Sequence, residues 1–405
     1  MNRRTFLTRF GSAGALLLAG ETVRARVLYL IDAGEAAKIS DVEWFLYDTQ
    51  SPGDDGQRRR RCAVRVTTTI GAQGWAAVSD WMFPEGDTAR HIKDLLLGRD
   101  AQDREGIWHF LYGEGIPLGT LSAVDIALWD LHGRLAGKPV HALLGTQRLD
   151  VPAYVTTEVN LGDPHAYADH ALACKEKGVP ACKIRPYIKW GAGTSGLTHA
   201  GFSDRDTEVY RAVRLAVGDD YRCMADNHGT YTFDEALRVG RLLDELAYDW
   251  YESPMPESGD WLDRYAALAR ELKTPICAPE TAPGSDSSRL AWIEQKACDI
   301  CRFDVSLGGL TACLRLAAAC EATATPLELH GLGPDSYPHL QLIAATRESL
   351  IRYFEMFSLS QDAVVLPGRV TPEPVFDEQG CVAVPQTPGM GLELDWQYIL
   401  AHRVQ

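Results

Sequence analysis

Acidic side chains recur in the second half of this chain, and each ends a short apolar run. Asp226 ends "RCMAD", Glu252 ends "WYE" and Glu280 stands in "ICAPET". A helix N-cap or a surface acid explains any one of them, but it explains three acids at matched positions poorly. Three carboxylates in one cleft cannot all stay ionised without a cation. Because hard oxygen ligands suit magnesium, we expect these residues to bind one Mg²⁺ ion per subunit.

A second group of residues has the chemistry to move protons. His330 ends "PLELH" and follows Asp304 by 26 residues. An aspartate on a neighbouring strand can hold a histidine in one tautomer and raise its basicity. A structural histidine and a turn cap ahead of Gly308 and Gly309 are the alternatives. The matched positions of the two residues favour a working pair.

Two further pairs of polar residues stand two positions apart. They are Asp226 with His228 in "ADNHG", and Lys183 with Arg185 in "ACKIRPY". Because alternate residues of a strand share a face, we expect each pair to point into one cleft. Arg185 can orient a substrate carboxylate, but it cannot act as a base because guanidinium keeps its proton in proteins. His228 can protonate a leaving hydroxyl group.

Together these residues suit the elimination of water from a hydroxy acid. When His330 removes the weakly acidic α-proton of a carboxylate, a divalent ion assisted by Lys183 stabilises the enediolate. His228 then protonates the departing hydroxyl group. A racemase or epimerase of a 2-hydroxy or related acid, with Lys183 as second base, is one alternative. A barrel that binds sugar acids without turnover is another.

The spacing of the acids predicts the elements that position them. From Asp226 to Glu355, the ends of the apolar runs follow one another every 24 to 28 residues. One strand and one helix fill such an interval, which indicates a (β/α) barrel with its site at the carboxyl ends of the strands. The interval from Lys183 to Asp226 is longer, 43 residues, and "KWGAGTSGLTHAGF" within it is typical of a loop over the site.

The first 145 residues have a different pattern. Strand-like alternation at 38–48 and at 62–80 precedes a helical stripe of leucines and a valine from Leu121 to Leu135. Gly137 and Pro139 end this helix. The pattern predicts an α+β unit.

The chain resembles the enolase superfamily, and within it the mandelate racemase subgroup. The resemblance rests on "SAVDIALWDLHGRLAGKPVHALLG", the three acids, "FDVSLGGLT", "RYFEMF" and "PGMGLELD". It implies an α/β fold, a modified TIM barrel of the (β/α)7β type with an N-terminal α+β capping domain. The superfamily combines a Lys or His base with Mg²⁺. The resemblance also implies that Glu355 hydrogen-bonds the substrate carboxylate or the enediolate.

One departure from the subgroup bears on the reaction. Lys183 and Arg185 stand where the subgroup often has a Lys-x-Lys pair, which disfavours inversion because inversion needs a base on each face. The Asp226-x-His228 arrangement is similar to that of D-galactonate and D-mannonate dehydratase-type members. The resemblance thus implies dehydration of an aldonate-type acid sugar to a 2-keto-3-deoxy acid.

We predict an N-terminal extension at 1–37, the capping domain at 38–148, the barrel at 149–365, and at 366–405 a segment that returns to the capping domain. "MNRRTFLTRF" resembles a twin-arginine export signal, which implies a periplasmic protein, with a cytoplasmic one as the alternative.

A net charge of −15 without a long basic tract argues against nucleic acid as a partner, and no apolar run is long enough to insert into a membrane. The four arginines at 58–61 are typical of a solvated loop or of one that reaches an anionic substrate. We expect a small carboxylate substrate and a homo-oligomer.

Overall fold

The computed structural model describes residues 37–52, 58–186, 202–258, 261–331 and 333–404. The predicted export signal and nearly all of "KWGAGTSGLTHAGF" lie outside these residues. The export signal, the loop over the site and the domain boundaries therefore stay predictions.

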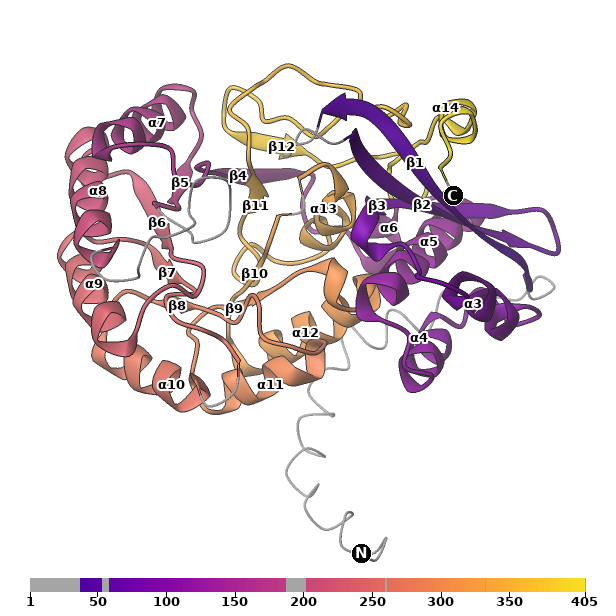
Figure 1. Cartoon of the computed structure of the whole chain (residues 1–405), viewed down its shortest axis with the longest axis horizontal. Coiled ribbons are helices and arrows are strands. Elements are labelled where there is room, and N and C mark those ends of the chain that lie inside the picture. The colour runs from indigo at the N-terminus through magenta and orange to yellow at the C-terminus, as the bar shows by residue number, and fades with distance from the viewer. Residues whose placement is uncertain (1–36, 53–57, 187–201, 259–260, 332, 405) are drawn as a thin grey trace, which may run out of the picture.

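In the described residues, eight parallel strands form the barrel at the left of Figure 1, and a helix follows each of the first seven. The strands are β4 (Asp150–Thr156), β5 (Ala181–Ile184), β6 (Arg222–Asp226), β7 (Trp250–Glu252), β8 (Ile276–Cys277), β9 (Cys301–Phe303), β10 (Leu327–Leu329) and β11 (Phe354–Met356). The helices are α7 (Pro164–Glu176), α8 (Phe202–Val217), α9 (Phe233–Glu245), α10 (Trp261–Glu271), α11 (Asp286–Glu294), α12 (Gly309–Thr323) and α13 (Tyr337–Ala344). This alternation confirms the predicted (β/α)7β barrel.

The ring of strands closes through hydrogen bonds between neighbours. One parallel ladder runs in the order β11-β4-β5-β6-β7-β8, and β9 pairs with β10. A bridge between Cys277 and Ile300 joins β8 to the chain entering β9, and the Leu327 amide donates to the Leu350 carbonyl oxygen ahead of β11. All the carboxyl ends therefore meet at one mouth, as the sequence period predicted.

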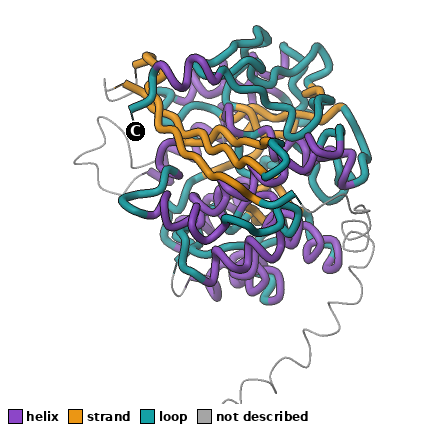
Figure 2. The backbone as a smooth tube through the Cα atoms, turned by 90° about the vertical axis from the view of Figure 1, so that its right-hand side faces the viewer, coloured by secondary structure: helices purple, strands orange, loops and turns teal. Residues whose placement is uncertain are grey.

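The N-terminal domain is an antiparallel sheet packed against helices. Its strands β1 (Ile39–Pro52), β2 (Arg58–Thr68) and β3 (Gln73–Ser79) lie side by side in the order β1-β2-β3. Figure 2 shows strands in orange, with purple helices beside them. Its helices are η1 (Asp80–Met82), α3 (Thr88–Leu96), α4 (Arg104–Gly113), α5 (Leu118–Ala136) and α6 (Val140–Leu144). The domain confirms the predicted α+β cap, and α5 ends as predicted at Gly137, which has φ +61°.

The C-terminal segment runs back to the cap. β12 (Cys381–Ala383) pairs with β4, and α14 (Trp396–Ala401) lies beside β1 in Figure 1. The Trp75 indole donates to the Leu392 carbonyl oxygen at 2.8 Å. The segment thus ties the cap to the barrel.

Helix α5 joins the cap to the barrel next to the turn after β9. Asp125 of α5 accepts hydrogen bonds from the hydroxyl and the amide of Thr311, at 2.5 and 3.0 Å. The Trp108 indole donates to the Gly308 carbonyl oxygen at 2.6 Å. Gly309 has φ +76°, and a Cβ there would lie 2.3 Å from the Asp125 carboxylate, so only glycine fits.

None of the helices in the described part of the chain combines the length and the apolar character that a membrane-spanning helix needs.

Candidate metal and acid–base centre

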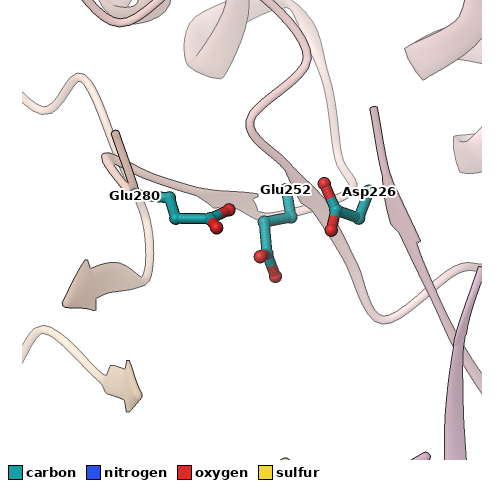
Figure 3. Close-up of side chains that lie close together, drawn as sticks. All are labelled: Asp226, Glu252 and Glu280. Atoms are coloured by element: carbon teal, nitrogen blue, oxygen red, sulfur yellow. The ribbon is translucent and has the colours of Figure 1, made fainter. Parts of the chain in front are cut away.

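Three buried carboxylates converge at the barrel mouth. Asp226 and Glu252 are the last residues of β6 and β7 and are paired across the ladder, and Glu280 follows β8. One ligand oxygen from each lies within 4.8 Å of the others, and Figure 3 shows the side chains of Asp226 and Glu280 on either side of Glu252. One Glu280 oxygen is buried without a hydrogen-bond donor from the described residues. This all-oxygen set, which we call the acidic triad, fits a hard divalent ion such as Mg²⁺.

Two buried cationic side chains, those of Lys183 and Arg302, contact the Glu252 carboxylate inside the barrel. The Lys183 ammonium is 2.8 Å from Glu252 Oε1, and Arg302 Nε is 3.0 Å from the same oxygen. The Trp250 indole donates to Glu252 Oε2 at 3.2 Å. Burial raises the pKa of Glu252 to about 8, although Arg302 and Lys183 oppose the rise. Without these cations the carboxylate would be harder still to ionise.

Glu355 is saturated with hydrogen-bond donors. Lys183 and the Thr156 hydroxyl lie 2.8 and 2.6 Å from Oε1, while Arg302 and the Gly331 amide both lie 2.6 Å from Oε2. Burial alone would raise the pKa of Glu355, but Lys183 and Arg302 hold it well below its usual value. Glu355 is therefore an ionised acceptor that anchors both cations. Its role toward substrate stays a prediction.

Lys183 is fixed as a cation. Burial and Arg302 would lower its pKa, but Glu252, Glu355 and the Asp226 carboxylate, 3.5 Å away, outweigh them and raise it. The side chain is 1% exposed. A protonated, enclosed lysine can neutralise developing charge but has no free electron pair with which to remove a proton.

His330 stands between Asp304 and the acidic triad. Its Nδ1 lies 3.4 Å from Asp304 Oδ2, and its Nε2 lies 3.3 Å from Glu280 Oε1. Burial would lower the pKa of His330, but Glu280 and Asp304 raise it to about 9. Asp304 also caps η2 (Val305–Leu307) by accepting from the Ser306 amide at 2.6 Å. The two interpretations of Asp304, turn cap and histidine partner, therefore both describe it.

His228 reaches the mouth by a different route from the one predicted. Strand β6 ends at Asp226, so strand alternation does not apply, and that reason was wrong. His228 instead lies in a left-handed turn with φ +47°, and its amide donates to Asp226 Oδ1 at 3.1 Å. The turn places His228 Nε2 4.0 Å from Glu280 Oε1. Two imidazoles thus flank one carboxylate oxygen.

Arg185 is half-buried directly after β5, which ends at Ile184. The shared face predicted for Lys183 and Arg185 stays a prediction. The Arg185 guanidinium donates to the Thr157 carbonyl oxygen at 3.2 and 3.3 Å and lies 5.4 Å from the Phe357 ring centre. Within the described part of the chain it makes no ion pair with the acidic triad.

Two features of the centre were missed from sequence. Arg302 stands two residues before Asp304 in "CRFDV", so strand alternation places both on the inner face and was the available signal. The arginines at 58–61 belong to β2 rather than to a solvated loop, and Arg61 forms a largely buried ion pair with Asp335. Arg369 contacts the same carboxylate at 2.6 Å, so Asp335 links the cap, the loop after His330 and the C-terminal segment.

The comparisons with known proteins agree with this geometry. Residues 54–145 match the N-terminal domain of the mandelate racemase/muconate lactonizing enzyme family, and residues 166–398 match the enolase C-terminal domain-like family. D-galactarolactone cycloisomerase of Agrobacterium fabrum is 30% identical over 357 residues, 84% of this chain and 90% of that protein. Arabinonate dehydratase of Saccharolobus solfataricus is 31% identical over 314 residues, 74% and 78% of the two chains. A crystal structure of D-glucarate dehydratase from Agrobacterium tumefaciens, complexed with magnesium, has a TM-score of 0.79 and 30% identity, covering 92% of this chain and all (100%) of that one.

Proposed function

This chain belongs to the mandelate racemase/muconate lactonizing enzyme family of the enolase superfamily, and from that premise we propose that it is a Mg²⁺-dependent hydro-lyase. Its substrate is an aldonate-type acid sugar and its product a 2-keto-3-deoxy acid. The observation that carries the proposal is the pair of imidazoles, His330 and His228, at 3.3 and 4.0 Å from one oxygen of Glu280. One histidine removes the α-proton and the other protonates the leaving group.

In the proposed reaction, each residue of the centre has a separate role. His330 takes the α-proton at Nε2 as the neutral imidazole, because Nδ1 faces Asp304 and keeps its hydrogen. A cation on Glu280 would offset the carboxylate charge that raises the pKa of His330. Mg²⁺, held by the acidic triad, would neutralise charge on the substrate carboxylate as the proton leaves. From inside the barrel, Lys183 supplies a positive charge that is already in place, so its side chain need not reorganise as negative charge develops on the substrate. His228 gives its proton to the departing 3-hydroxyl group.

A cycloisomerase is the second candidate, because a relative that is 30% identical bears that name. If the β-oxygen belongs to a ring, the same base and acid open the ring instead of releasing water. The product is then an isomer of the substrate. Product mass separates the two reactions, since only dehydration lowers it by one water.

The test is a screen of acid sugars and their lactones with Mg²⁺, scored with a reagent for 2-keto acids and by product mass. Turnover of at least one aldonate by the wild type, lost in His330→Asn, supports the proposal. A protein that is thermally stabilised by sugar acids, equally so in His330→Asn, but turns none over is a binding protein and refutes it. Inversion at C2 without a keto product would identify a racemase instead.

A further inference from the structure

Among the described residues, five charged side chains inside the barrel form one connected group of ion pairs. Lys183 contacts three carboxylates, at 2.8, 2.8 and 3.5 Å, and Arg302 contacts two of the same three, at 2.6 and 3.0 Å. Glu280 joins them as the third ligand of the acidic triad. We call this group the barrel charge cluster: Lys183, Asp226, Glu252, Glu280, Arg302 and Glu355. It contains four acids and two bases, all buried.

We propose that Arg302 sets the charge of the metal site, so that the site is matched to a divalent ion. Metal ligands bind as carboxylates, and Glu355 is ionised by its two cations. His330 and Asp304, 3.4 Å apart, form a separate pair of opposite charges and leave the balance unchanged. With Lys183 and Arg302 both positive, the barrel charge cluster then keeps two uncompensated negative charges, which one divalent ion neutralises. Without Arg302 it would keep three. The inference rests on the proposed magnesium site and deepens it.

The geometry of Arg302 suits this task. One Nη donates to Glu355 at 2.6 Å and the other to the Tyr154 hydroxyl at 3.0 Å, while Nε lies 3.0 Å from Glu252 Oε1 without hydrogen-bond geometry. The guanidinium thus lies between the two carboxylates. The side chain is 0% exposed, and Glu252 and Glu355 raise its pKa well above the usual value against the effect of burial. Charge in such a dry environment is screened little, so its loss is felt by the whole cluster.

Two further buried acids lie near the barrel charge cluster but have donors of their own. Glu257 accepts from the Ser253 hydroxyl at 2.7 Å, and Glu328 accepts from the Arg352 amide at 3.1 Å. Burial raises the pKa of both, that of Glu328 to about 7. Neither forms an ion pair with Lys183 or Arg302 among the described contacts. Both acids are present in every variant described below, so their charges do not affect the comparison of ion preference between variants.

The experiment measures ion selectivity rather than activity. Mg²⁺ and Tb³⁺ are titrated into the full-length protein, and their dissociation constants are compared for wild type, R302M, R302K and the double variant R302M/E355Q. Because R302M leaves three negative charges, we expect its preference for Tb³⁺ over Mg²⁺ to rise at least about tenfold above that of wild type. R302K keeps the charge and should keep the wild-type preference. The double variant removes one charge of each sign and should return to the wild-type preference within about threefold.

A matched control removes a buried arginine elsewhere. Arg214 is 5% exposed and, within the described part of the chain, donates only to backbone carbonyl oxygens, such as those of Leu246 and Tyr221. R214M should therefore leave ion selectivity unchanged. An unshifted preference in R302M, or an equal shift in R214M, overturns the inference alone. A wild-type protein that binds neither ion overturns it together with the proposed function. If R302M does not fold, the double variant decides: its failure to fold while R302K folds also overturns the inference.

Discussion

Replacing His228 by asparagine should separate the two halves of the proposed reaction. His330 keeps its own partner Asp304 at 3.4 Å in this variant, so removal of the α-proton does not depend on His228. The leaving group loses its proton donor. A general acid contributes about 10²- to 10⁴-fold, so the dehydration rate should fall by that factor, equivalent to roughly 3 to 5 kcal/mol in the barrier. Exchange of the α-proton with solvent should continue.

Asparagine is the suitable replacement because position 228 has φ +47°. Asparagine tolerates this left-handed conformation better than most residues, so the turn that follows Asp226 should persist. The assay incubates an aldonate in D₂O, follows the loss of the α-proton signal by NMR, and measures the 2-keto product in parallel. His330→Asn is the control and should lose both signals. Full-rate dehydration by His228→Asn would show that His228 is not the acid, and joint loss of exchange and dehydration would show that its role is structural.

Three further predictions follow from buried charge. Glu252→Gln should remove the rise in melting temperature that Mg²⁺ produces in the wild type, with the fold retained by circular dichroism; an undiminished rise would place the metal elsewhere. Asp335→Ala leaves two arginines without their shared anion and should cost about 3 to 5 kcal/mol in unfolding free energy by urea denaturation, whereas removing the exposed Asp220 should cost nothing measurable. Burial raises the pKa of Asp206 from 3.8 to about 7, so the folded state holds a proton there that the unfolded state loses near pH 4. Wild type should therefore lose stability relative to Asp206→Asn as pH rises from 4 to 7, and parallel stability curves of the two proteins would contradict this.

Much of the fold was predictable because strand ends are marked by polar residues. Asp226 and Glu252 are the last residues of their strands, and Asp304 follows β9 directly. Glu280 lies beyond the end of β8, but the segment between them is short. The regular spacing of the polar residues along the chain therefore still applied to it. The start of α9 is also marked in the sequence, because Thr232 and Glu235 have the T-x-x-E spacing of a capping box and exchange hydrogen bonds there.

The inner charges of the barrel were harder to predict. Arg302 and its two acidic partners are separated by about 50 residues in either direction, and only closure of the barrel brings them together. A single sequence shows the arginine but not its partners. His228 was assigned to the mouth by an alternation that does not exist, because its left-handed φ depends on the turn ahead of Gly229, whose amide donates to the Ser253 carbonyl oxygen at 2.6 Å. Local pattern therefore located the polar residues at the strand ends, whereas the partners of Arg302 and the orientation of His228 depended on contacts distant in sequence.

The same contacts bear on the choice between elimination and inversion. Inversion at C2 needs a proton acceptor on each face of the substrate, and Lys183 was the candidate for the second face. In the structure Lys183 is enclosed by carboxylates that raise its pKa, and Arg185 cannot release a proton at all. His228 then remains as the second group able to exchange protons at the mouth, and it lies beside the same Glu280 oxygen as His330. Two imidazoles around one oxygen of the acidic triad suit removal of a proton from one carbon and donation of a second proton to an oxygen on the next, which is why we favour β-elimination over racemisation.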